Sequence, residues 1–167
     1  RTLIDGLPVG APKEIIKDFR NAKIYDSSCS PEARVFYIEK NGGYYLKRAA
    51  TGSLRTEADM TCYFHTKGLG AEVIDYMSEG EYDFLLTSRV IGEDCTHESA
   101  LARPEWLCDT IAARLRALHE LDAHECPVAD RTATYLATVD QNFRTGGYDT
   151  SHFPDNWGFA SAREAID

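Results

Sequence analysis

The chain has 167 residues, of which 43% are hydrophobic and 27% are charged, a composition typical of a globular protein with a sizeable core. Its net charge of −9 argues against nucleic acid and anionic membrane surfaces as partners and suits a polycationic ligand. No apolar run approaches the roughly 18 residues of a membrane span, so we expect no membrane segment, and we expect no signal peptide.

The cysteines are odd in number, widely spaced and without a CxxC pair, which favours free thiols in a reducing cytosol and hence a cytoplasmic protein. They are Cys29, Cys62, Cys95, Cys108 and Cys126. A zinc site could be imagined from His119, His124 and Cys126, but no fourth ligand stands at a recognisable spacing, so we predict no metal site.

Short strands and turns alternate over the first ninety residues. Residues 34–39 alternate between apolar and polar side chains, as a strand does, and Asn41-Gly42 is a typical hairpin turn. Leu54, Ala58 and Cys62 recur at helical spacing before Gly68. The expected elements are a helix over 12–19, a strand starting near Ile24, strands over 34–39 and 44–47, a helix over 53–67, and strands over 71–76 and 82–90.

The second part of the sequence is helical. Pro104 begins an amphipathic helix with apolar residues at Leu107, Ile111, Leu115 and Leu118. A further helix is expected over about 131–143, and another begins at 161 and stops within about two turns. We therefore expect the domain to continue beyond this chain.

Lys47 and Glu57 are the residues best suited to chemistry. Lys47 ends a predicted strand, and Glu57 follows ten residues later in the second turn of a predicted helix. A lysine on a rigid strand, oriented by a carboxylate, is how protein kinases hold nucleotide phosphates. Taken alone, the pair also fits an edge-strand lysine and an ordinary helical glutamate.

The predicted elements follow the order of a kinase-like fold, with a sheet first, then a connecting strand and then helices. Residues 115–127 read LRALHELDAHECP. From about Asp26 onward the chain resembles the N-terminal portion of an aminoglycoside phosphotransferase, closest to the 3'-phosphotransferase group. The resemblance implies an α+β, protein-kinase-like fold. Residues 1–90 would form an antiparallel sheet lobe with one crossing helix, and residues 91–167 the hinge end and the first part of a helical C-terminal lobe.

The resemblance also implies a nucleotide site for ATP or GTP. Lys47 would meet the α- and β-phosphates, with Glu57 holding its ammonium group. The turn at 26–31 stands where the family has a phosphate-covering loop, so Ser28 and Ser30 are candidate phosphate contacts. That turn lacks the GxGxxG pattern of protein kinases, and an ordinary hairpin turn fits it as well.

The adenine ring is expected at the predicted hinge. By position, Tyr45 resembles the aromatic residue that stacks on adenine, although a core or edge tyrosine is the alternative. Ser88 and Val90 are the expected main-chain hydrogen-bonding partners. Asp155, in an Asp-Asn-Trp segment, resembles an acidic substrate-binding position that would meet the ammonium groups of an aminoglycoside.

The catalytic loop of the family, His-Gly-Asp-x-x-x-x-Asn, and its later metal-binding Asp do not occur in this sequence. No catalytic residue is therefore assigned in this chain, and the base and the Mg²⁺ ligands are expected beyond Asp167. We expect this 167-residue piece alone to be inactive and to bind nucleotide only weakly, unless a C-terminal part complements it.

The expected function is ATP-dependent phosphorylation of a hydroxyl group of an aminoglycoside antibiotic, which gives resistance in the family. A related kinase of choline, a macrolide, a sugar amine or homoserine would have the same nucleotide half. A naturally short, non-catalytic nucleotide-binding or interaction module, or a scaffold that binds no nucleotide, is the alternative outside the enzymes.

Overall fold

The computed structural model describes residues 1–128, 131–148, 158, 161 and 163–164. The chain divides into two compact units, Arg1–Pro127 and Val128–Asp167. The first unit extends well past residue 90, where we expect the sheet lobe to end. The division into lobes at 90/91 stays a prediction.

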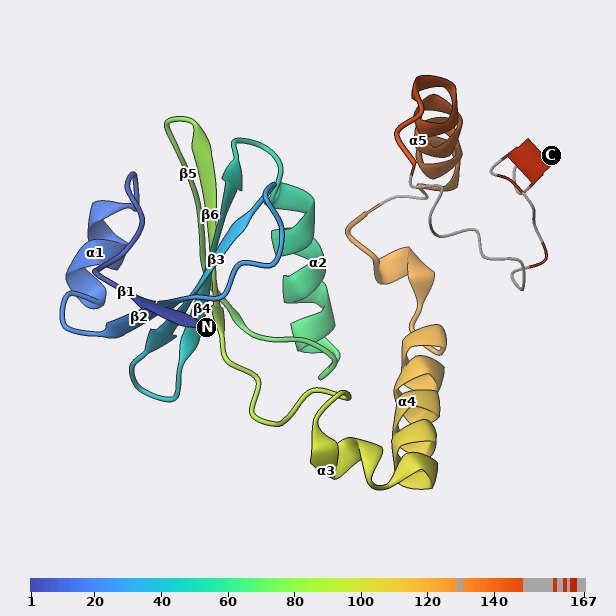
Figure 1. The fold of residues 1–167 in the computed structure, drawn as a ribbon, viewed down its shortest axis with the longest axis horizontal. Helices are drawn as coiled ribbons and strands as arrows, with labels where there is room; N and C mark the ends of the chain where they lie inside the picture. The colour runs from blue at the N-terminus through green and yellow to red at the C-terminus, as the bar shows by residue number, and fades with distance from the viewer. Residues whose placement is uncertain (129–130, 149–157, 159–160, 162, 165–167) are drawn as a thin grey trace. The chain divides into compact units, whose positions relative to one another are not determined.

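Six strands form one antiparallel sheet in the order β1-β2-β3-β4-β6-β5 (Figure 1). The predicted strands are confirmed, while β1 lies in a segment whose sequence looked only amphipathic and rich in turns. The strands are β1 (Thr2–Ile4), β2 (Lys23–Asp26), β3 (Arg34–Glu39), β4 (Tyr44–Ala50), β5 (Val73–Glu79) and β6 (Tyr82–Ser88).

The predicted Asn-Gly turn joins β3 to β4. Asn41 has a φ of 46° and Gly42 a φ of 96°, both left-handed conformations that asparagine and glycine tolerate better than other residues. The N–H of Gly43 donates to the carbonyl of Lys40 at 2.9 Å. This turn sets the register in which β3 and β4 pair, and that register fixes which β4 side chains share a face.

The two faces of the sheet carry separate apolar clusters, because successive side chains of a strand point to opposite faces. Helix α1 (Lys13–Asp18) and helix α2 (Arg55–Thr66) lie on opposite sides of the sheet (Figure 1). The cluster at α1 contains Ala11, Ile15, Phe19, Ile24, Phe36, Ile38, Leu46, Phe84 and Leu86. The smaller cluster at α2 contains Ala49, Leu54, Ala58 and Leu85.

Helices follow the sheet, as the apolar spacing predicts. They are α3 (Glu98–Leu101), α4 (Pro104–His119), a single 3-10 turn over Ala123–Glu125 and, in the second unit, α5 (Thr132–Thr145). Helix α3 was not predicted. None of the described helices has the length and apolarity needed to cross a bilayer.

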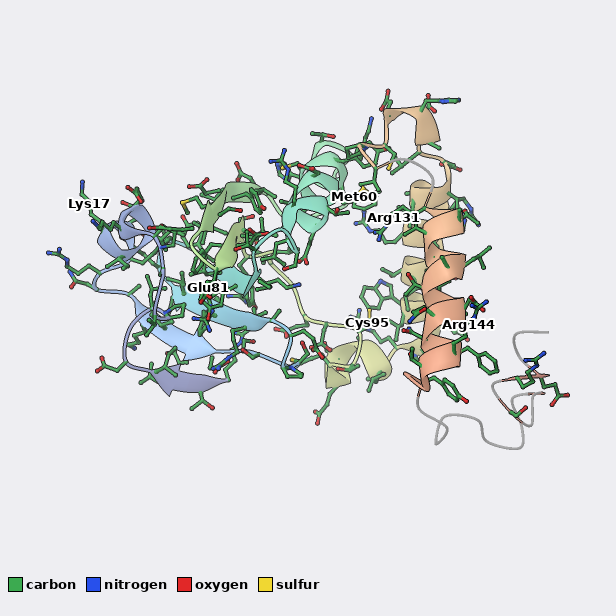
Figure 2. The ribbon with its side chains drawn as sticks, turned by 90° about the horizontal axis from the view of Figure 1, so that it is seen from above. Lys17, Met60, Glu81, Cys95, Arg131 and Arg144 are labelled. Carbon is green, nitrogen blue, oxygen red and sulfur yellow. The ribbon has the colours of Figure 1, made fainter. Side chains whose placement is uncertain are left out.

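The segment that follows α4 contacts the C-terminal half of α2. Met60 (Figure 2) and Tyr63 lie in α2, and Lys67 follows it directly. The contacts are an ion pair between Lys67 and Glu125, a hydrogen bond of 3.3 Å from the Tyr63 hydroxyl to the Asp122 carbonyl, and a distance of 3.7 Å between Cys126 Sγ and Met60 Sδ. The Leu-Asp-Ala-His-Glu-Cys-Pro stretch thus holds one end of the helix that carries Glu57.

Candidate functional site

Lys47 and Glu57 form an ion pair on the α2 face of the sheet. Lys47 Nζ donates to Glu57 Oε2 at 2.7 Å. The Lys47 side chain is 30% exposed and the Glu57 side chain 44% exposed, so solvent reaches both. The expected contact between the two side chains is therefore present. The charged ammonium group is oriented by a carboxylate but remains accessible to a further anion.

The sequence around the pair explains why the two side chains meet. Lys47 lies between Val35 of β3 and Leu85 of β6 in the sheet register. Leu85 packs with Leu54 and Ala58, which are buried at the start of α2. Because Glu57 directly precedes Ala58, this apolar contact sets the first turn of α2 beside Lys47.

Tyrosine rings line the same face of the sheet next to Lys47. The Tyr37 and Tyr45 ring centroids are 5.3 Å apart, and those of Tyr25 and Tyr37 are 6.0 Å apart. The guanidinium carbon of Arg1 lies 4.5 Å from the Tyr37 centroid, and Arg1 also donates to the Tyr45 hydroxyl. Tyr45 therefore belongs to an aromatic surface that can carry a flat or cationic group.

Tyr37 is the member of this surface that sequence reasoning missed. It lies directly opposite Tyr45 in the register of β3 and β4, a pairing that the Asn-Gly turn determines. Pairing the residues of β3 and β4 outward from the Asn-Gly turn identifies Tyr37 as the partner of Tyr45.

The serine turn between β2 and β3 is held by its own side chains. Ser28 Oγ accepts hydrogen bonds from Arg34 Nε at 3.1 Å and from the Val35 N–H at 3.0 Å. Hydrogen bonds from the Ser28 hydroxyl and N–H, together with the Arg34 guanidinium, lower the pKa of Asp26 to about 2. The turn, with Ser30 near its tip, lines a hollow beside Arg1 and Arg34.

Two consequences follow for the predicted loop residues. The hydroxyl oxygen of Ser28 is already an acceptor within the turn, while Ser30 is exposed. Arg34, which sequence reasoning did not single out, also lines this hollow, where its guanidinium group is ion-paired with the Asp26 carboxylate. Phosphate contacts by Ser28 and Ser30 stay predictions.

The predicted hinge residues lie at the end of β6. The N–H of Ser88 donates to the Glu72 carbonyl at 2.9 Å, and Ser88 Oγ accepts from the Glu72 N–H at 3.1 Å. A main-chain contact from Ser88 to adenine would therefore use its carbonyl group. Val90 follows the strand and is 65% exposed. The adenine contacts of Ser88 and Val90 stay predictions.

A strand lysine held by a helical glutamate is the arrangement with which kinase-like enzymes bind nucleotide phosphates. A sequence model of the phosphotransferase enzyme family matches residues 31–166. The chain belongs to this family. The resemblance drawn from residues 26 onward is thereby confirmed at the level of the family.

Named relatives of this phosphotransferase family member are aminoglycoside 3'-phosphotransferases. A probable aminoglycoside 3'-phosphotransferase of Lactococcus lactis is 40% identical over 156 residues, covering 93% of this chain and 59% of the relative. The aminoglycoside 3'-phosphotransferase of Staphylococcus aureus is 24% identical, covering 93% of this chain and 62% of the relative. The chain thus spans about three fifths of the length of these relatives.

A solved structure supports the kinase-like fold of this family. The crystal structure of an aminoglycoside-3'-phosphotransferase of type VIII aligns with 92% of this chain and 59% of that protein, with a TM-score of 0.73 and 19% identity. The predicted fold class is therefore confirmed, with the six-stranded antiparallel sheet as its N-terminal part.

Two further parts of the predicted phosphotransferase site are not placed. Asp155, the expected substrate contact, lies outside the described residues. Within the described ranges, no three His, Cys, Asp or Glu side chains gather as a metal site. No catalytic base is assigned.

Proposed function

We propose that this chain is the nucleotide-binding part of a phosphotransferase that moves the γ-phosphoryl group of ATP or GTP to a hydroxyl of an aminoglycoside. The observation that carries the proposal is the ion pair of 2.7 Å between Lys47 on β4 and Glu57 on α2. The family of the chain and the names of its relatives support the reaction and the substrate class.

The residues around the ion pair fit a polyanionic nucleotide. Lys47 offers an ammonium group that is oriented but open to solvent, and phosphate oxygens would neutralise it. The serine turn offers the exposed Ser30 hydroxyl near Arg34, whereas the N–H groups of Ser27 and Ser28 already donate within the turn. Tyr45 offers an aromatic surface for the base. When bound, the nucleotide supplies the phosphoryl group that is transferred.

The division of labour in the reaction follows from these residues. Lys47 binds and orients phosphates, and Glu57 keeps the ammonium group of Lys47 in place. Mg²⁺ belongs to the proposal through the family, but no ligand set for it is placed among the described residues, and no transfer step is assigned to a side chain.

An aminoglycoside fits the charge of this protein. A net charge of −9 favours a polycationic substrate, and Asp155 is the residue we propose for one of its ammonium groups. Adding a phosphate would weaken the cationic drug's affinity for ribosomal RNA, which gives resistance. A cytosolic location, where nucleoside triphosphates are available, is part of the same proposal.

The test is a phosphorylation assay with the full-length natural protein that contains this sequence. ATP and GTP are each combined with aminoglycosides that carry or lack a 3'-hydroxyl group, and with choline, homoserine and a macrolide. We expect mass spectrometry to find a phosphorylated product only from aminoglycosides, and Lys47→Met to abolish it. Phosphorylation of choline, homoserine or the macrolide instead would overturn the substrate class, and turnover that survives Lys47→Met would overturn the site.

A further inference from the structure

Asp83 lies on β6, and its charged side chain is completely buried. It is the only charged side chain among the described residues with this degree of burial. Its carboxylate accepts hydrogen bonds from the Leu54 N–H at 3.0 Å, from the Tyr76 hydroxyl at 3.0 Å and from the Ser78 hydroxyl. A buried carboxylate is costly unless such donors surround it. Burial alone would raise the pKa of Asp83, but these hydrogen bonds and one from the Gly52 backbone outweigh it and keep the pKa below its ordinary value.

The Leu54 hydrogen bond places this carboxylate at the N-terminus of α2. The first N–H groups of a helix have no partner within the helix, and a side chain at the N-cap commonly accepts from them. Leu54 is the N-cap residue of α2, and no side-chain cap is made there. Asp83 supplies an acceptor from the neighbouring sheet instead, and its negative charge also suits the positive end of the helix dipole.

The sheet register connects Asp83 to Lys47. Asp83 pairs with Ala49, and Leu85 pairs with Lys47, so Asp83 and Lys47 share a face of the sheet and lie one side-chain step apart along it. Glu57 follows Leu54 by three residues, within one helical turn. The carboxylate therefore fastens the backbone of α2 to the sheet one turn away from the contact between Glu57 and Lys47.

The other end of α2 is held by different groups, the segment over 122–126. That contact fixes the C-terminal half of the helix and leaves its first turn to be positioned from the sheet. The apolar contacts of Leu54 and Ala58 are non-directional. The hydrogen bond from Leu54 to Asp83 is directional, so it can set how far along β6 the helix begins.

We propose that Asp83 is a positioning residue for nucleotide binding, because its buried carboxylate holds the start of α2 where Glu57 meets Lys47. The proposal rests on the proposed function. A positioning role differs from a purely structural role in one respect. A positioning residue acts on the nucleotide through Glu57, so the losses in kcat/KM caused by changing Asp83 and by changing Glu57 are not independent.

The test is a double-mutant cycle in the full-length natural protein, with kcat and KM for ATP measured below the unfolding range of every variant. The variants are Asp83→Ala, Glu57→Gln, the double variant, and Asp83→Asn, whose amide keeps the shape and an acceptor. Ile38→Ala is the matched control, because Ile38 is fully buried but belongs to the apolar cluster on the opposite face. Hydrogen exchange of residues 54–60 reports the attachment of the helix directly.

We expect Asp83→Ala to lower kcat/KM for ATP about tenfold in the wild-type background and less than about twofold in the Glu57→Gln background. Asp83→Asn should retain most of the activity. Exchange over residues 54–60 should accelerate in Asp83→Ala and not in Ile38→Ala, although both lose thermal stability. If Asp83→Ala does not fold, Asp83→Asn takes its place in the cycle, with a smaller loss that again disappears in the Glu57→Gln background.

The proposal would be overturned if the fold losses in kcat/KM caused by Asp83→Ala and by Glu57→Gln multiplied in the double variant. A loss of activity that Ile38→Ala reproduces, or unchanged exchange at the start of α2, would also overturn it. Failure of the proposed function gives a different pattern, because the unaltered protein then transfers no phosphoryl group or Lys47→Met leaves transfer intact. The exchange measurement needs no turnover, so in that case it still decides whether Asp83 attaches the start of α2, while the role in nucleotide binding falls with the proposed function.

Discussion

Glu57→Gln should separate stability from function at the candidate site. The substitution removes the charge that Lys47 Nζ contacts at 2.7 Å while keeping the size of the side chain. Two unit charges at this separation attract by about 1.5 kcal/mol in bulk water. Ion pairs with comparable exposure stabilise proteins by about 0–1 kcal/mol when measured. We therefore expect urea unfolding to show a loss of at most about 1 kcal/mol.

The expected effect on nucleotide use is much larger than the effect on stability. A neutral amide oxygen holds the Lys47 ammonium group less firmly than the carboxylate does, and misplacement of a binding group by about 1 Å can cost about a hundredfold in rate. We expect kcat/KM for ATP in the full-length protein to fall about ten- to a hundredfold. Steady-state kinetics with varied ATP measures it.

Asp59→Asn is the control for this experiment. It breaks the ion pair between Asp59 and Arg55, which is also exposed and lies on the same helix. We expect it to leave kcat/KM unchanged. An unchanged kcat/KM in Glu57→Gln, an equal fall in Asp59→Asn, or a stability loss above about 3 kcal/mol in Glu57→Gln would refute the reasoning.

Two further predictions concern the turns that flank the site. The pKa of Asp26 lies at about 2, below the ordinary 3.8, so Asp26 stabilises its turn above about pH 4 and loses this effect as the pH falls through about 2. A carboxyl NMR titration should show a midpoint near 2, and a midpoint near 4 would contradict the observed contacts. Gly43→Ala should cost about 1–3 kcal/mol in thermal unfolding, because its Cβ would lie 2.8 Å from the Tyr37 hydroxyl. Gly42→Ala, with a similar φ but open space around it, is the control, and an equal loss in both would mean that the Tyr37 contact does not matter.

Strands β2 to β6 and the α2 helix could be predicted from sequence because each depends on a local pattern. Alternation marks β3, helical spacing marks α2, and the Asn-Gly turn fixes the register that points Lys47 toward one face. Only the family pattern distinguishes Lys47 and Glu57 from ordinary strand and helix residues.

Residues whose role depends on distant contacts were not found. Asp83 reads as a polar residue in an apolar strand, and only its contact with Leu54, 29 residues away, reveals the attachment of α2. Tyr37 becomes relevant only through its pairing with Tyr45 across β3 and β4. Strand β1 is three residues long, too short for an alternating pattern to stand out.

The binding of ATP to Lys47 variants tests the proposed function most directly. Isothermal titration calorimetry on the full-length natural protein compares the unaltered chain with Lys47→Met and with Lys23→Met, a control at an exposed lysine of β2. We expect Lys47→Met to weaken ATP binding at least about tenfold and Lys23→Met to change it less than about twofold. Equal ATP affinity in all three proteins would contradict a phosphate-binding role for Lys47.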